Sequence, residues 1–348
     1  MRFHSLTALF LGLFVAGLSL TAAPAMAIGQ ACSPERLTGG NIAAYETVLK
    51  FTDFSCTWTP PAGLTQALVL VVAGGGGGGA NCVGGGGGAG GLLDRTTFAM
   101  TAAPISIQVG SGGTGGASNP TCSAAAGGNG ANSIFGTLTA IGGGGGGSFS
   151  SHADGAAGGS GGGGSGGNDP SNTGAGGVAV SGQGHDGGHG RVDFRGNPGA
   201  GGGGAGGAGG SSASDRGGTG GDGYSSVISG TQTFYAGGGG GSTDSLFFGG
   251  AGGSGCGGTG GSGSGNTPNV DTLAPTEATG FGCGGGGADG TYYGATSGSP
   301  GVVIVRFITP TDLPDTGHNS TLIPGIASLV AIAAGVSLLL VRRRFVGE

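Results

Sequence analysis

Long runs of glycine dominate this chain and restrict how it can fold, because glycine has no side chain to bury in a core. Glycine accounts for 97 of the 348 residues, and glycine and proline together for 111. Such a composition without a strict period is typical of low-complexity or disordered segments. The pattern nevertheless indicates order, because each of four glycine tracts follows an apolar or aromatic lead-in. These tracts are 74–79, 142–147, 237–241 and 284–287.

Short β-branched stretches among the tracts predict a mainly β fold. They are Glu46–Phe51, Ala67–Val72, Ile105–Val109 and Val302–Phe307. Ala67–Val72 and Val302–Phe307 are almost wholly apolar and predict largely buried strands. The glycine-, alanine- and serine-rich stretches between them can form extended helices with three residues per turn, whose backbones approach closely where glycine faces a neighbour. We therefore expect a β-sheet framework with glycine-rich segments that are polyglycine II-like or irregular.

Two of the tracts belong to a longer repeat. Gly127–Phe135 and Gly217–Ser225 each precede a glycine tract, which predicts a unit that runs from a Gly-Asn or Gly-Asp turn through a short hairpin into polyglycine. Both stretches also fit a calcium-binding nonapeptide, with Asn132 in place of Asp in the first. Calcium coils need consecutive copies, and these two begin 90 residues apart. A turn that opens a hairpin is therefore the preferred interpretation.

Both ends of the chain carry export or membrane signals. Arg2, an apolar run from Ala8 to Leu20 and the small residues Ala25 and Ala27 predict a signal peptide, residues 1–27, cleaved after Ala27. An uncleaved signal anchor is the alternative. Leu322–Val341 contains twenty residues without a charge, enough for a transmembrane helix. The stop-transfer residues Arg342, Arg343 and Arg344 follow it in a cytoplasmic tail, 342–348, so the bulk of the chain is expected outside.

All six cysteines lie between these terminal segments. An even number of cysteines in an exported chain predicts three disulfides, for which fifteen connectivities exist. Sequential grouping favours Cys32–Cys56, Cys82–Cys122 and Cys256–Cys283. A metal site is the alternative interpretation, but no C-x-x-C pair is present to favour it.

The segment Leu313-Pro314-Asp315-Thr316-Gly317 is similar to the LPxTG sorting signal of Gram-positive surface proteins. The resemblance includes the order of the parts, because an apolar span and a basic tail follow the pentapeptide. It implies that a membrane sortase cleaves between Thr316 and Gly317 and links Thr316 to an amine of the peptidoglycan precursor. Pro314 disfavours a helix and presents the motif in an extended form. A chance Pro-Asp-Thr-Gly turn before an ordinary anchor is the alternative.

The glycine-rich body resembles a glycine-rich domain of bacterial and phage surface proteins. The stretches that carry the resemblance are Thr59–Leu64 before Val69–Gly76, then Gly85–Gly91, and finally Ser299–Phe307. It implies a β-sheet framework with polyglycine II-like segments and no enzymatic activity. The expected organisation is a signal peptide (1–27), an N-terminal segment (28–44), the glycine-rich domain (45–308), a linker (309–312), the sorting motif (313–317), a spacer (318–321), the span (322–341) and the basic tail (342–348).

Composition and spacing argue against other functions. Charged residues make up 8% of the chain and the net charge is −6, whereas nucleic-acid binding needs clustered Lys and Arg. His185 and His189 flank Asp186, but without a helix their spacing does not bring them together on a metal. No Gly-x-Gly-x-x-Gly match opens a predicted helix, and no Ser, His or Asp has a recognisable catalytic setting. We expect no enzyme, no cofactor and no metal.

The sequence thus predicts a secreted, non-catalytic protein that a sortase anchors to peptidoglycan, with the membrane as a transient partner. Its role would be that of a wall or coat structural protein, or of an adhesin with an unknown ligand. Only a short linker precedes the motif, without a Pro/Thr/Ser stalk, so we expect the protein to lie close to the wall. A lectin-like binding module is the alternative. Its contact candidates are Phe247, Phe248, Tyr292 and Tyr293.

Overall fold

The computed structural model describes residues 30–80, 82–117, 126–149, 153–167, 169, 173–192, 197–243, 248–262, 273–289 and 293–310. It divides into two compact units, and every described residue except Pro310 belongs to the first, Met1–Thr309. The predicted signal peptide, sorting motif, transmembrane span and basic tail lie outside the described residues. Within those ranges, no helix is long and apolar enough to cross a bilayer.

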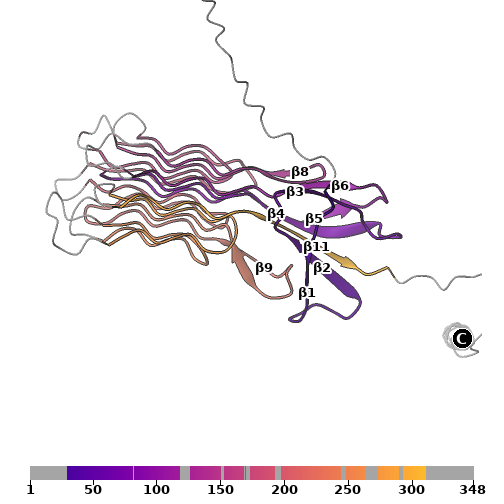
Figure 1. The fold of residues 1–348 in the computed structure, drawn as a ribbon. Coiled ribbons are helices and arrows are strands. Elements are labelled where there is room, and N and C mark those ends of the chain that lie inside the picture. Colours follow the sequence, from indigo (N-terminus) through magenta and orange to yellow (C-terminus); the bar gives the residue numbers. More distant parts are fainter. Residues whose placement is uncertain are drawn as a thin grey trace, which may run out of the picture. The chain divides into compact units, whose positions relative to one another are not determined.

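The framework consists of antiparallel strands in two main sheets (Figure 1). A five-stranded sheet has the order β1-β2-β11-β4-β5, and a four-stranded sheet has the order β3-β6-β7-β8. A separate hairpin pairs β9 with β10. The strands are β1 (Glu35–Leu37), β2 (Glu46–Phe51), β3 (Ser55–Trp58), β4 (Gln66–Val72), β5 (Leu92–Ala99), β6 (Ile105–Gln108), β7 (Ser133–Phe135), β8 (Leu138–Ala140), β9 (Tyr224–Ser226), β10 (Thr233–Tyr235) and β11 (Val302–Ile308).

The two central strands of the larger sheet, β4 and β11, are buried on both faces, which explains their nearly continuous apolar sequences. On one face, Val69, Val71, Val303 and Val305 belong to a core cluster shared with the four-stranded sheet. Aromatic rings of both sheets meet in this cluster, and the Phe51 and Trp58 centroids lie 5.8 Å apart, edge to face. The prediction of largely buried strands here is confirmed.

On the opposite face, the β9–β10 hairpin covers part of the five-stranded sheet. Leu70, Val72 and Ile304 form a second core cluster with Tyr235 of β10 and with Ile228, which lies between the hairpin's strands. Tyr235 and Ile228 are each only 2% exposed. The burial of these two side chains fixes the hairpin against the sheet, which matters for the cleft described below.

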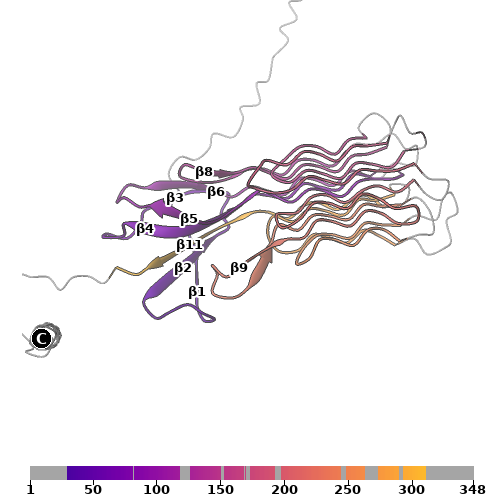
Figure 2. The same ribbon diagram turned by 180° about the vertical axis from the view of Figure 1, so that it is seen from behind.

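Glycine-rich segments run side by side away from the sheets, and the strands continue directly into them (Figures 1 and 2). Their backbone hydrogen bonds recur every third residue. Along 73–79, successive N–H groups donate to three different segments, at 2.8–3.1 Å. The pairs are Ala73–Gly91, Gly76–Gly88 and Gly79–Gly85, then Gly74–Ala131 and Gly77–Gly128, then Gly75–Ser299 and Gly78–Thr296. This period agrees with the expected three-residue-per-turn extended helix.

Segment 73–79 has six hydrogen-bonded neighbours in all. Its N–H groups donate to three antiparallel segments, and its carbonyls accept from three parallel ones. The parallel pairs are Gly113–Gly75 and Gly116–Gly78, Gly143–Gly74 and Gly146–Gly77, and Gly285–Gly76 and Ala288–Gly79. We call this array of hydrogen-bonded segments the glycine lattice. Nearly every buried backbone N–H and C=O group needs a hydrogen-bond partner. In the lattice, the successive N–H and C=O groups of a central segment find these partners on the segments that surround it.

Close approach, and not backbone conformation, is why these positions are glycine. A Cβ added at Gly87 would lie 2.1 Å from the carbonyl oxygen of Gly76, and one at Gly85 would lie 2.1 Å from that of Gly163. The obstructing atoms are backbone, so they cannot turn aside as a side chain would. The glycines of 74–79 and 84–91 do not have positive φ. Any side chain at these sites would push two segments apart.

The repeat predicted around Asn132 and Asp222 is only partly right. A hairpin does lie between each stretch and its glycine tract, namely β7–β8 and β9–β10. The expected Gly-Asn or Gly-Asp turns are wrong, because 127–132 and 217–223 are extended segments of the lattice. The side-chain oxygens of Asn129 and Asn132 accept hydrogen bonds from the N–H groups of Gly145 and Gly142, at 2.9 and 2.8 Å. Lattice hydrogen bonds thus replace the turn.

Two of the predicted disulfides are confirmed. Cys32–Cys56 and Cys256–Cys283 have Cα–Cα distances of 4.9 and 5.7 Å. The first joins the segment before β1 to β3, and the second joins the turn at 254–256 to Cys283, which precedes the glycine tract 284–287. Cys82 is also disulfide-bonded. Its predicted partner, Cys122, lies outside the described residues.

An ion pair fastens the start of β2 to the end of β11. The Glu46 carboxylate accepts hydrogen bonds from Nε and Nη2 of Arg306 at 3.1 and 2.6 Å, and both side chains are largely buried. The Arg306 hydrogen bonds and a further one from the Ala43 N–H hold the pKa of Glu46 below its ordinary value of 4.5. Unfolding therefore becomes easier as pH falls through the folded-state pKa.

The lattice predicts that Gly87→Ala destabilises the protein while Gly207→Ala does not. At Gly87 the new methyl group would overlap backbone, which should reduce the free energy of unfolding by about 3 kcal/mol. At Gly207 the nearest atom would be at an ordinary 3.6 Å, and φ is not positive. Denaturant unfolding of the full-length protein measures both. Equal stability of the two variants would contradict the lattice.

The ion pair predicts that Glu46→Gln removes part of the acid sensitivity of the fold. Below pH 4.5 the wild-type protein should lose stability more steeply than the variant. The reason is that the unfolded wild type binds a proton at Glu46 more readily than the folded wild type, whereas the variant has no carboxyl group there. Glu35→Gln is the matched control. Glu35 pairs with Lys50 on the adjacent strand but is 59% exposed, so its ion pair should contribute little. Melting temperatures from pH 3 to 7 provide the comparison.

Candidate functional site

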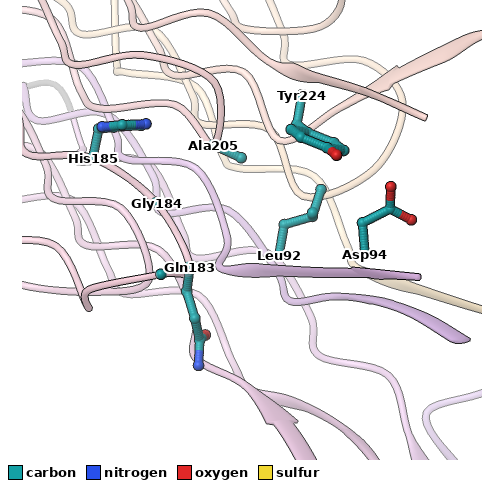
Figure 3. Close-up of a pocket in the computed structure, with 8 residues that line it drawn as sticks. Leu92, Asp94, Gln183, Gly184, His185, Ala205 and Tyr224 are labelled. Atoms are coloured by element: carbon teal, nitrogen blue, oxygen red, sulfur yellow. The ribbon is translucent and has the colours of Figure 1, made fainter. Parts of the chain in front are cut away.

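A cleft of about 350 Å³ opens where the edge strand β5, the β9–β10 hairpin and the glycine lattice meet (Figure 3). Its volume is within the usual range of small-molecule sites. The lining residues come from four separate parts of the chain. They are Leu92, Asp94, Gly182, Gln183, Gly184, His185, Ala205 and Tyr224.

Tyr224 forms one wall of the cleft and is the first residue of β9. It lies directly opposite Tyr235 across the hairpin, so the two side chains share a face. Tyr235 is buried against the sheet, whereas Tyr224, at the border of the covered area, is 39% exposed. The hairpin therefore presents an aromatic ring to the cleft from a position that the core holds in place.

Leu92 and Asp94 form the side that β5 contributes. They are two residues apart on one strand, so their side chains point to the same face of the sheet. Leu92 is buried, and Asp94 Oδ1 accepts a hydrogen bond from Ser226 Oγ at 3.1 Å. In Figure 3 the Asp94 carboxylate and the Tyr224 ring lie on the same side of the cleft. This bond orients the carboxylate.

The lattice side of the cleft is a turn at 181–183 followed by Gly184 and His185. The Gln183 side chain points away from the cleft and fixes the turn to β8 and its continuation. Its Oε1 accepts from the Ile141 N–H at 2.8 Å, and its Nε2 donates to the Thr139 carbonyl at 3.1 Å. His185 is exposed and lies across the cleft from Asp94 (Figure 3). Leu92, Ala205 and the Tyr224 ring contribute apolar atoms to a lining that also carries polar groups.

The side chains weighed as metal ligands in the sequence, His185, Asp186 and His189, have separate surroundings. Asp186 Oδ1 accepts from the Ala179 N–H at 2.7 Å, and His189 Nδ1 accepts from the Gly176 N–H at 3.4 Å. His185 faces the cleft instead. Across the described ranges, no three His, Cys, Asp or Glu side chains cluster as metal ligands would.

The side chains that would bind calcium in the two nonapeptides also accept hydrogen bonds from backbone amides instead. Asp222 Oδ1 accepts from the Ser254 N–H at 3.3 Å, and Asn132 is bonded to Gly142. Both side chains satisfy backbone amides of neighbouring lattice segments. Acceptor oxygens used in this way stabilise the lattice and do not converge on an ion.

The other predicted site residues are distributed as follows. The signal cleavage residues Ala25 and Ala27 and the sorting motif lie outside the described residues, as do Phe247 and Tyr292. Phe248 is 63% exposed, with the Arg216 guanidinium 5.9 Å from its ring centroid, and Tyr293 is 39% exposed. Neither lines the cleft.

Sequence reasoning did not identify Asp94 or Tyr224 as site residues. They are 130 positions apart and carry no motif, and β5 itself was not predicted because polar residues interrupt it. The available signal was weak: a carboxylate within a short apolar-flanked stretch, and a tyrosine that follows a lattice segment.

A comparison with known families gives a match. The sequence model of a family described as a glycine-rich domain matches residues 51–308. No curated protein matches the chain.

Proposed function

The chain belongs to the glycine-rich domain family, and from this premise we propose that it is a non-catalytic cell-surface protein that a sortase attaches covalently to peptidoglycan. Its role there is that of a wall or coat structural protein, or of an adhesin. It is exported, passes through the membrane only transiently, and resides in the cell wall. Sortase and peptidoglycan are its partners.

The observation that carries this proposal is the order of signals at the C-terminus. The sorting motif Leu313–Gly317 is followed by an uncharged stretch from Leu322 to Val341 and then by Arg342–Arg344. The span and the arginines would halt export and hold the pentapeptide at the outer face of the membrane. Transfer at the Thr316–Gly317 bond would leave Thr316 as the wall-linked terminus and release Gly317–Glu348 in the membrane.

Two features of the folded body support export and a structural role. Disulfides such as Cys32–Cys56 and Cys256–Cys283 persist in oxidising compartments. The lattice uses its backbone groups to join segments to one another, and the chain carries few charges for steering a partner. Such a body is suited to a passive, stiff coat.

Wall anchoring is tested by mass spectrometry of peptidoglycan digests from the producing cell. We expect a C-terminal peptide that ends at Thr316 and carries a peptidoglycan stem. Deleting Leu313–Gly317 should remove essentially all wall-linked protein, because the sortase loses its substrate, and should leave the intact tail in the membrane fraction. A wild-type chain that keeps its tail in membranes would refute the proposal.

The folded body ends only a few residues before the sorting motif in the sequence. The Thr309 N–H donates to the Tyr45 carbonyl at 2.8 Å, and the hydroxyls of Thr47 and Thr309 lie 2.7 Å apart. Only residues 310–312 remain before Leu313, a reach of at most about 10 Å. This short connection supports a position within or on the wall.

Antibody labelling of intact cells tests that position. Antibodies against the folded body should label untreated cells weakly and label cells after partial wall digestion several-fold more strongly. Inserting a flexible linker of 60 residues after Pro310 should restore labelling of untreated cells, because its coil would extend roughly 40 Å. Full labelling of the wild type without digestion would contradict a position close to the wall.

A further inference from the structure

We propose that Asn129 and Asn132 close one side of the glycine lattice, so that it does not take up an extended glycine segment from another molecule. The two side chains lie beside the tract 142–147, which has fewer lattice neighbours than the central segments among the described residues. The inference goes beyond the proposed anchoring, which rests on the C-terminal signals, and either can fail without the other.

The tract 142–147 has five hydrogen-bonded neighbours among the described segments, one fewer than 73–79. Its carbonyls accept from three segments, and its N–H groups donate to two. The three are 84–91, 126–132 and 153–159, and the two are 73–79 and 160–166. A three-residue period gives every lattice segment three sets of N–H groups, which point in three directions. In this tract, one set therefore has no backbone partner in the described part of the chain.

That set consists of the N–H groups of Gly142 and Gly145. Side-chain oxygens replace a lattice segment there, because Asn132 Oδ1 accepts from Gly142 at 2.8 Å and Asn129 Oδ1 accepts from Gly145 at 2.9 Å. Both glycines are buried, whereas both asparagines are exposed at the rim of the lattice. The second bond repeats the first one turn further along, as the three-residue period requires. The asparagines thus satisfy two buried donors that would be costly to leave unpaired.

The same arrangement recurs at the edge segment 174–180. Asp154 Oδ1 accepts from the Ala175 N–H, and Asp186 Oδ1 accepts from the Ala179 N–H, both at 2.7 Å. Here too each acceptor side chain belongs to an adjacent segment of the lattice. The exposed edges of β-sheets pair readily with other chains unless they are blocked. Side-chain caps block the edge of the lattice in the same way.

The side that the asparagines close has the geometry of a lattice position. Successive neighbours around 142–147 also bond to one another, as 126–132 does to 73–79 and 160–166 does to 153–159. Among the described backbone groups, only 126–132 and 153–159 share no such bond, so the open side lies between them. A segment placed there would meet three backbones at once. Such close contact requires glycine elsewhere in the lattice, so the occupant that fits is an extended glycine peptide.

Replacing both asparagines by glycine in the full-length chain, in polyoxyethylene detergent, tests the proposal. Saturation-transfer NMR measures the binding of N-acetyl-pentaglycine amide, with the pentaalanine peptide as a contrast. The double variant should bind pentaglycine with a dissociation constant of about 1 mM, and the wild type should bind it about tenfold more weakly. Neither protein should bind pentaalanine, because its methyl groups would overlap the lattice backbone.

Two further variants separate closure from general damage to the fold. Asn129→Asp combined with Asn132→Asp keeps an acceptor oxygen at each cap, so this variant should remain closed like the wild type. Asp186→Gly is the matched control. It removes the cap of Ala179, on an edge segment with three hydrogen-bonded neighbours, and should not create a site for pentaglycine.

Amide hydrogen exchange measures the caps directly. In the double glycine variant, the N–H groups of Gly142 and Gly145 should exchange about tenfold faster than in the wild type, because they lose their acceptors. The Gly143 and Gly146 N–H groups, which donate to 73–79, should be affected less and serve as internal controls.

Three results would overturn the proposal. One is equal binding of pentaglycine by the wild type and the double glycine variant, since the asparagines would then close nothing. Another is a folded double variant whose Gly142 and Gly145 amides exchange faster but which binds no pentaglycine. The last is unchanged exchange of these two amides, which would show that the asparagines do not cap them.

Discussion

The hydrogen bonding of glycine backbone in three directions is the interaction on which the rest of this structure depends. A β-strand pairs only with the strands on its two sides, but each central lattice segment has six neighbours. One backbone hydrogen bond contributes a net of about 0.5–1.5 kcal/mol, while ordering one residue costs about 1–2 kcal/mol. An isolated segment is therefore not stable, and the lattice must form cooperatively. Its close packing requires that no side chain intervene.

The β framework makes that cooperation possible because its strands continue into the lattice. β4 leads directly into 73–79, and 84–91 leads back into β5. The two core clusters fix the strands, so the lattice segments start in register and are spaced by the sheets. The cleft lies where these two kinds of structure meet. A sheet presents side chains on its faces, whereas the lattice presents mainly backbone. Where they meet, the Tyr224 ring and the Asp94 carboxylate therefore lie opposite glycine-rich backbone.

Much of the framework could be predicted from sequence. The apolar runs of β4 and β11 could be predicted because a strand buried on both faces has a nearly continuous apolar sequence. Cys256 and Cys283 could be paired because they follow one another in the order of cysteines along the chain. β5 was not, because Asp94, Thr96 and Thr97 interrupt its pattern at the edge of the sheet. The turns expected at Asn132 and Asp222 were wrong, because lattice neighbours distant in sequence supply the hydrogen bonds that a local turn would otherwise make.

The sequence by itself predicted the buried strands β4 and β11, and it favoured, among fifteen connectivities, the two disulfide pairs that the structure describes. It also carries the export and sorting signals on which the proposed function rests. Only the tertiary structure decided which segments are neighbours, and hence that Leu92, Asp94 and Tyr224 share a cleft. The physical reason is that glycine tracts are nearly identical to one another. Without side chains they contain no information about register or partner, so the surrounding sheets, cores and disulfides must select both.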